Sequence, residues 1–192
     1  MVDQVAELIS EVATLRRAVR NEPLPGAWDH VRDVDRFLRR RVEELHRLPL
    51  VAVEHAELDH YGSGYASYID VFATKRDGST RQTDEDGGVR IECLNVLLCR
   101  LAPIACLLRP DDLWQTHDTS WSPSPNINRV IAAPDQSWAD EFHQVKDLLD
   151  QRGISLIGPD LLTRPLPEGL EAKSNLANPA RTIFDAWFHW PD

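Results

Sequence analysis

The segment "VRIECLNVLLCRLAPIACLL" (residues 89–108) constrains the fold more than any other part of the chain. Apolar and polar residues alternate at first, so that one face is made of Val89, Ile91 and Cys93. From Leu94 onward both faces are apolar, which is typical of a strand covered on both sides in the centre of a sheet. Pro103 interrupts the run and Pro110 ends it, which predicts a tight reversal into a neighbouring strand that stops at Pro110.

Two more strands are predicted before this segment. "VAVEHAEL" (residues 51–58) and "YASYIDVFAT" (residues 65–74) are rich in β-branched and aromatic residues, and glycine-containing turns bound them. The acidic turn "DEDGG" (residues 84–88) then leads into the central strand. These patterns predict a mainly antiparallel sheet of four to six strands.

Helices are predicted at both ends of the chain. Residues 3–20 and 27–47 have apolar side chains at spacings of three and four, and "NEPLPG" between them predicts a turn, so we expect an antiparallel helical hairpin over residues 1–48. Residues 137–152 and "TIFDAWFHW" (182–190) predict C-terminal helices packed on one face of the sheet. The expected fold class is α+β, with the hairpin and an α+β body over residues 49–192 forming one compact unit.

The aromatic C-terminus is interpreted mainly as core. Asn178 and Pro179 are suited to the first positions of a helix, and Phe184, Trp187 and Phe188 would lie on the sheet, with Trp190 nearest the surface. Deletion of residues 179–192 is therefore expected to unfold the protein.

The composition is that of a globular protein, with 42% hydrophobic and 27% charged residues. No apolar stretch is long enough to cross a bilayer, and the N-terminus lacks a basic region followed by an apolar block, so we expect a cytoplasmic protein. The 18 arginines against three lysines indicate a GC-rich, bacterial coding sequence. The three cysteines lie in apolar sequence, which favours reduced, buried thiols.

The net charge of −10 is unevenly distributed. Residues 1–50 hold nine acidic and nine basic side chains, so residues 51–192 hold 22 acidic against 12 basic. An acidic body argues against binding to nucleic acid phosphates and favours a basic protein partner.

Catalytic and metal sites are weakly indicated. His55 and His60 are close in sequence, but on a strand they would point to opposite faces and would not converge on a metal. Motifs for phosphate or dinucleotide binding are missing from the sequence, so no cofactor is expected. If the protein were an enzyme, the candidates would be His55 with Glu57 and Asp59, or His117 with Asp118.

A partner-binding surface is the stronger prediction, because three carboxylates stand side by side in the hairpin turn. Acids in the neighbouring strands would add to the field, and a loop tryptophan is a candidate anchor. We expect the binding residues to be Glu54, Glu57, Asp59, Asp77, Asp84, Glu85, Asp86 and Trp121.

Three stretches, "GGVRIECLNVLLCRLAPIACLL", "DLLDQRGISLIGPDLLTRPLP" and "TIFDAWFHW", give residues 87–192 a pattern that resembles the immunity proteins encoded beside bacterial polymorphic toxins. The resemblance implies a non-catalytic protein that binds and neutralises a toxin domain inside the producing cell. It assigns no binding residues, and it leaves out the N-terminal helices. Two alternatives remain open: an enzyme using the residues named above, and a scaffold protein that self-associates as a homodimer through the apolar stripe on residues 5–19.

Overall fold

The computed structural model describes residues 2–28, 31–59, 65–85, 87–115, 120–121, 124–171 and 181–190. Its elements follow the order of an α+β fold, which confirms the predicted class. The strands are β1 (Val51–Glu57), β2 (Tyr68–Lys75), β3 (Arg81–Thr83), β4 (Val89–Cys99), β5 (Ile104–Gln115), β6 (Ser120–Trp121) and β7 (Ser155–Leu156). The α-helices are α1 (Val2–Ser10), α2 (Val12–Ala18), α3 (Val34–His46), α4 (Ala139–Gln151), α5 (Pro159–Leu162) and α6 (Ile183–Trp187).

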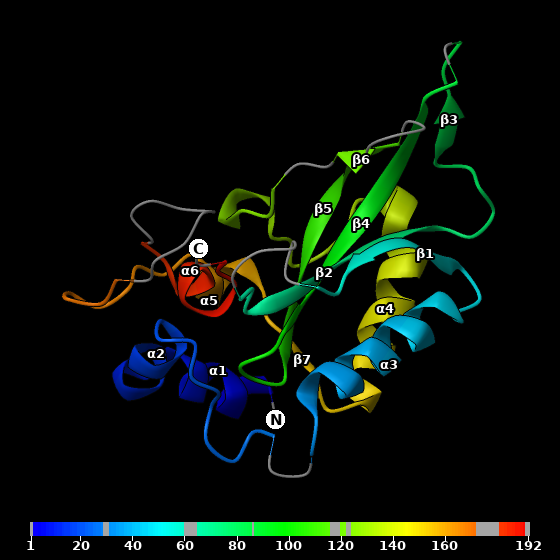
Figure 1. Ribbon diagram of the computed structural model, residues 1–192. Coiled ribbons are helices and arrows are strands. Elements are labelled where there is room, and N and C mark those ends of the chain that lie inside the picture. The colour runs from blue at the N-terminus through cyan, green and yellow to red at the C-terminus, as the bar shows by residue number, and fades with distance from the viewer. Residues whose placement is uncertain are drawn as a thin grey trace.

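One seven-stranded sheet forms the centre of the molecule (Figure 1). The main path runs β1-β2-β4-β5-β6. β3 pairs with residues 89–91 in the outer part of β4, by which we mean residues 89–93, and β7 pairs with the first two residues of β5. Every pairing is antiparallel except that of β7 with β5. The five longer strands lie within the predicted range of four to six, and the two-residue strands β6 and β7 extend the sheet beyond it.

Helices cover both faces of this sheet. The first helical layer consists of α1, α2, α5 and α6, which pack on the face that carries Tyr68, Leu97 and Cys106. The second helical layer consists of α3 and α4, which pack on the opposite face around Val71 and Val96. The alternation of β2, β4 and β5 therefore sends successive apolar side chains into two separate cores.

The predicted N-terminal helical hairpin is not formed. Residues 3–20 divide at Glu11 into α1 and α2 in the first layer, whereas α3 belongs to the second layer. Ile9 and Leu15 pack in the first core, and the stripe of α3 packs in the second core, so the two stripes do not cover each other. The C-terminal helices are likewise divided between the two faces, with α4 on one and α5 and α6 on the other, so the expectation of a single covered face is corrected.

The chain crosses from one face to the other around the β4–β5 turn. The backbone N–H of Leu24 donates to the carbonyl of Leu101 at 2.8 Å, and the indole N–H of Trp28 donates to the carbonyl of Arg100 at 2.9 Å. Leu24 belongs to the first core and Trp28 to the second. These two hydrogen bonds hold the crossing segment against the end of the sheet.

Arg100 organises the same end of the sheet from inside, where it is only 2% exposed. Its guanidinium donates to the carbonyls of Ala66, Tyr68 and Leu58 and pairs with Asp35 at 2.8 Å. Burial of an arginine costs free energy unless its N–H groups find acceptors. In Arg100 all three guanidinium nitrogens donate, to acceptors on three segments. Arg100 therefore joins the β4–β5 turn to three segments: the start of α3 and the two ends of the β1–β2 connection.

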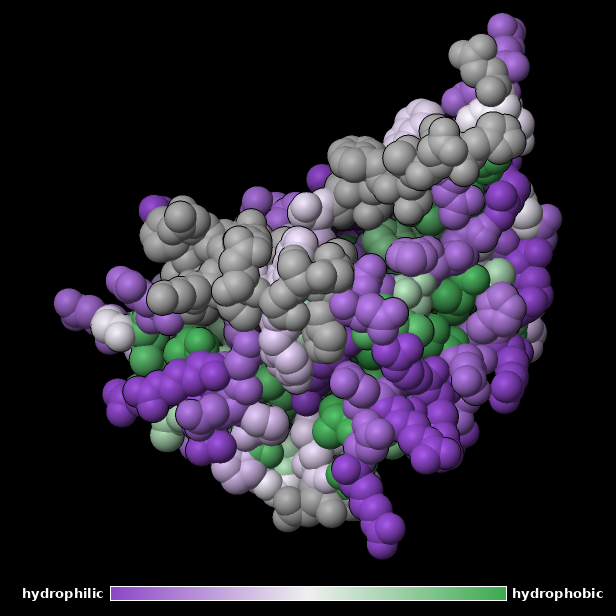
Figure 2. Space-filling model, in the orientation of Figure 1, coloured by the Kyte–Doolittle hydropathy of each residue, from purple (hydrophilic) through white to green (hydrophobic). Residues whose placement is uncertain are grey.

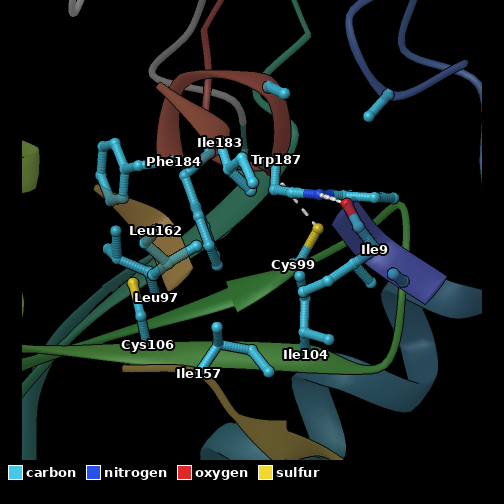
Figure 3. Close-up of a cluster of buried hydrophobic side chains, with 14 of the residues drawn as sticks. Ile9, Leu97, Cys99, Ile104, Cys106, Ile157, Leu162, Ile183, Phe184 and Trp187 are labelled. Carbon is cyan, nitrogen blue, oxygen red and sulfur yellow. Dashed lines mark hydrogen bonds between the residues drawn. The ribbon is translucent and has the colours of Figure 1, made fainter. Parts of the chain in front are cut away.

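The C-terminal aromatic residues complete the first core (Figure 3). The N–H of the Trp187 side chain donates to the carbonyl of Ile9 at 3.1 Å, and the Cys99 thiol donates to the carbonyl of Trp187 at 3.4 Å. Phe184, Trp187 and Phe188 are at most 1% exposed, whereas Trp190 is partly exposed. A capping box between Thr182 and Asp185 starts α6. The predicted capping residues Asn178 and Pro179 lie outside the described residues.

His189 follows α6 and is buried, so the stability of the folded protein depends on the pH at which this imidazole binds a proton. Burial lowers the pKa of its imidazole from 6.5 to about 4. Between these values the unfolded chain binds a proton that the folded protein does not, so we expect the free energy of unfolding to fall as the pH drops from 6.5 toward 4. Urea titrations of the wild type and of His189→Gln across this range measure the effect, because the carboxylates titrate in both proteins. A difference between them that is independent of pH would contradict the buried, neutral imidazole.

Among the described residues, no helix combines the length and apolar character needed to cross a bilayer.

Candidate functional site

The most prominent surface feature is the hairpin of β3 and the outer part of β4, which extends beyond the rest of the molecule (Figure 1). We call residues 81–85 and 87–93 the projecting hairpin. Its turn is closed by hydrogen bonds from the Asp84 N–H to the Gly88 carbonyl at 2.8 Å and from the Gly87 N–H to the Asp84 carbonyl at 3.0 Å. Gly87 has a φ of 79°, a left-handed conformation that glycine adopts without steric cost.

The strand β5 pairs with the outer part of β4 because it does not end at Pro110 as predicted. Cys93 of β4 pairs with Asp111, whereas Asn95 pairs with Leu108, so Arg109 and Pro110 form a bulge opposite Leu94. A proline is tolerated in a strand at a bulge, where the ladder is already interrupted. β5 therefore continues to Gln115 and supports β4 along its outer part.

The two faces of this outer sheet differ in character. On one face, a small buried core forms from Phe72, Ile91, Cys93 and Leu113. On the other, Trp114 remains 37% exposed, with the Arg90 guanidinium 5.7 Å from its ring centroid. Arg90 also pairs with Asp112 at 3.4 Å. The second face thus presents an aromatic surface beside the acidic tip.

The tip acids have no compensating charge in the described part of the chain. Asp84 and Glu85 are exposed, and neither forms an ion pair there. Hydrophilic side chains mark this extremity in Figure 2. Asp86, the third predicted acid of the turn, lies outside the described residues. The tip is therefore a concentrated negative charge held away from the body.

The predicted acids of β1 and Asp59, which lies just after that strand, differ from the tip acids because each has a local partner. Glu54 is the extra residue of a bulge in β1 and pairs with Arg81 of β3. Asp59 pairs with Arg39 at 2.8 Å, and Glu57 accepts a hydrogen bond from the Asp59 N–H at 2.9 Å. The Glu54–Arg81 pair joins β1 to the base of the projecting hairpin.

Asp77 lies in the turn between β2 and β3 and is fully exposed. Its carboxylate accepts a hydrogen bond from the Ser79 N–H at 2.9 Å, and this bond lowers the pKa of the Asp77 carboxyl. Asp77 therefore stabilises its own turn, as aspartate commonly does, and stays ionised.

The predicted anchor Trp121 is described by its backbone alone, which pairs with Trp114 where β6 meets β5. Trp114 itself was missed by the sequence analysis, because β5 was expected to end before it. The signal that could have found it is the alternation in "DDLWQ", where Leu113 is buried and its neighbours Asp112 and Trp114 face outward.

The residues named as alternative catalytic candidates do not converge on one point in the described part of the structure. His55 is exposed and lies beside the ring of Phe72, with 5.8 Å between the centroids, while Glu57 and Asp59 make the local bonds given above. His117 and Asp118 fall outside the described residues. Across the described ranges, no three His, Cys, Asp or Glu side chains are arranged to hold a metal ion.

The cysteines are buried thiols, as the apolar sequence around them predicts. Burial raises the pKa of Cys93 and of Cys99 to about 12 and raises that of Cys106 well above its usual value. At neutral pH all three are protonated, and a protonated thiol is a poor nucleophile.

A buried polar group was missed by the sequence analysis and lies where the projecting hairpin leaves the body. The side-chain amide of Asn95 donates to Asp70 at 3.1 Å, and the Arg129 guanidinium pairs with Asp111 at 3.3 Å. Asp70, Asn95 and Arg129 are at most 3% exposed. Asp70 and Asn95 are each a lone polar residue in an apolar stretch, and this was the available signal, whereas Arg129 directly follows Asn128 and gave no such signal. The Arg129–Asp111 pair ties the short helical turn Ile127–Arg129 to β5.

Comparison of the chain with protein-family models, with curated proteins and with solved structures finds no match to any of them.

Proposed function

We propose that this protein is a non-catalytic inhibitor, of the immunity-protein type, that binds a basic toxin domain in the bacterial cytoplasm. The observation that carries the proposal is the projecting hairpin, which extends beyond the rest of the molecule (Figures 1 and 2). Asp84 and Glu85 in its turn are exposed and form no ion pair with the described residues. A protruding acidic element of this shape can enter the cleft of a basic partner and block it.

Electrostatics supports this function through the rate of association. The chain carries a net charge of −10, with the acidic excess after residue 50, so a cationic protein is attracted from a distance. The charge at the tip would then orient the partner toward the hairpin. Backbone hydrogen bonds already join Asp84 to Gly87 and Gly88, which reduces the conformational entropy that these residues would lose on binding.

Trp114 supports the proposal as a source of binding energy. An exposed tryptophan beside a charged tip is the type of residue that most often dominates the energetics of an interface. We therefore assign the partner-binding surface to Asp84, Glu85 and Trp114. Glu54 and Asp59 are left out of this surface. Their charges are already paired with Arg81 and Arg39, so they attract a partner less than the tip acids do.

Capture from the native host tests the function. The intact protein is used as bait in a lysate, and captured proteins are identified by mass spectrometry and sized with the bait. The expected result is a basic protein bound one to one, whose toxicity to a test strain is suppressed when the bait is expressed with it. If the bait is folded and the basic proteins encoded beside its gene neither bind it nor lose toxicity, the inhibitor function is rejected.

A second candidate, self-association, is favoured by one observation in the first helical layer. Leu8 of α1 and Val12 of α2 are 39% and 49% exposed, so two large apolar side chains are left uncovered on either side of the break at Glu11. Sedimentation velocity is the measurement. A dimer that Leu8→Asp dissociates, and that Asp84→Lys/Glu85→Lys leaves intact, would support a scaffold. A monomer at all concentrations examined would exclude it.

A further inference from the structure

A hollow on the outer side of α3 has the opposite charge to the rest of the molecule. Its volume is about 320 Å³, and it is lined by Val31, Arg32, Asp33, Arg36, Phe37 and Arg40. Arg36 and Arg40 lie on α3 about one turn apart, roughly 6 Å along its axis, and Arg32 comes just before the helix cap Asp33. Together the three arginines line the hollow with positive charge.

These arginines differ from Arg39, Arg41 and Arg47, which form ion pairs within the described part of the chain. Arg39, Arg41 and Arg47 pair with carboxylates at 2.8, 3.2 and 3.6 Å. Within the described residues, the three arginines of the hollow form no ion pair, although the chain carries ten more negative than positive charges. The carboxylate of Asp33 also lines the hollow, but it accepts the Arg36 backbone N–H at 3.0 Å as the helix cap.

The floor of the hollow is apolar and supported from behind. The Phe37 ring meets the Trp28 ring edge-on at 5.6 Å between centroids, and the Arg41 guanidinium lies 4.7 Å from the Phe37 centroid. Val31 and Phe37 both pack against the second core. The hollow is thus held by the fold, and it combines apolar surface with three cationic side chains.

From this combination we propose that the hollow binds a polyphosphate chain, either that of a nucleoside triphosphate or an inorganic one. Guanidinium groups form paired, charge-assisted hydrogen bonds to phosphate oxygens, and three of them lining one hollow suit a ligand with several adjacent negative charges. The apolar floor would accept the organic part of a nucleotide. This site is separate from the projecting hairpin and does not depend on the function proposed for it.

Isothermal titration calorimetry of the intact protein with ATP, tripolyphosphate and adenosine tests the site. We expect ATP and tripolyphosphate to bind and adenosine not to bind, with affinity that falls as salt is added. Tighter binding of ATP would identify a nucleotide as the ligand, and equal binding would identify the inorganic chain. Binding of neither polyphosphate, or of adenosine as tightly as ATP, would overturn the proposal.

Two matched variants test whether polyphosphate binds in the hollow or to exposed arginines in general. Arg36→Gln/Arg40→Gln removes two charges from the hollow and is expected to weaken polyphosphate binding at least roughly tenfold. The control Arg16→Gln/Arg47→Gln removes two exposed arginines elsewhere and should leave the affinity within about a factor of two. Unchanged thermal unfolding would show that both proteins are folded. Equal weakening in the two variants would overturn the site.

Discussion

Replacement of Trp187 by alanine is expected to lower the free energy of unfolding by about 3–5 kcal/mol, the usual cost of removing a buried tryptophan from a core. Trp187 is fully buried among residues of α1, β4 and α6 (Figure 3), and its indole N–H satisfies the carbonyl of Ile9. The substitution leaves both a cavity and an unpaired carbonyl. Since the free energy of unfolding of a domain is only about 5–15 kcal/mol, the substitution would remove much of the stability. Chemical denaturation followed by circular dichroism measures it.

Trp114→Ala is the matched control, because it makes the same chemical change at an exposed position. Trp114 is 37% exposed and contacts Arg90, so we expect a loss of about 1 kcal/mol or less. Similar losses in the two variants would mean that the C-terminal segment does not close the first core.

Replacement of Arg100 by methionine is expected to cost about 3 kcal/mol or more. Methionine approximates the size of the side chain but cannot donate to the buried carbonyls of Ala66 and Tyr68, which would lose their charged partner. The pair with Asp35 would also be lost, although this contributes less because the Asp35 side chain is 47% exposed. Urea denaturation of the two proteins gives the difference.

Arg47→Met provides the comparison for Arg100. Arg47 follows α3, its side chain is 74% exposed, and it pairs with Glu43 at 3.6 Å. The expected change is within about 0.5 kcal/mol, as for most surface substitutions. If Arg100→Met were as mild as Arg47→Met, the proposed role of Arg100 in joining three segments would be wrong.

The strands were predictable because their signals are local. Alternation in residues 89–93, the apolar run after Leu94 and the prolines and glycines between segments correspond to β4, β5 and their turns. The α4 helix follows the predicted residues 137–152 closely, since its apolar stripe and Gly153 are both visible in the sequence. Each of these inferences needs only neighbouring residues.

The arrangement of helices was not predictable in the same way. An amphipathic stripe shows that one side of a helix is buried, but it does not identify what covers it. α1 and α3 could pack on each other or on the sheet, and the choice depends on long-range contacts such as Leu24 with Leu101. The continuation of β5 through Pro110 depends in the same way on the bulge opposite Leu94.

For the candidate site, too, the local features were predictable from the sequence and the long-range contacts were not. The acids of the turn and their exposure follow from a hairpin tip, where carboxylates have nowhere to be buried. The counter-charges were hidden, because Arg81 reaches Glu54 and Arg39 reaches Asp59 across the sequence. These pairings narrow the predicted acidic surface to the tip.

The central claim, that the hairpin tip binds a basic partner, is tested most directly by the dissociation constant of the captured complex. Asp84→Lys/Glu85→Lys is compared with Asp147→Lys/Glu168→Lys, which reverses two exposed acids outside the hairpin. Surface plasmon resonance should show binding weakened roughly 100-fold by the hairpin reversal and by much less in the control. Equal affinity for the two variants would contradict the assignment of the binding surface to the projecting hairpin.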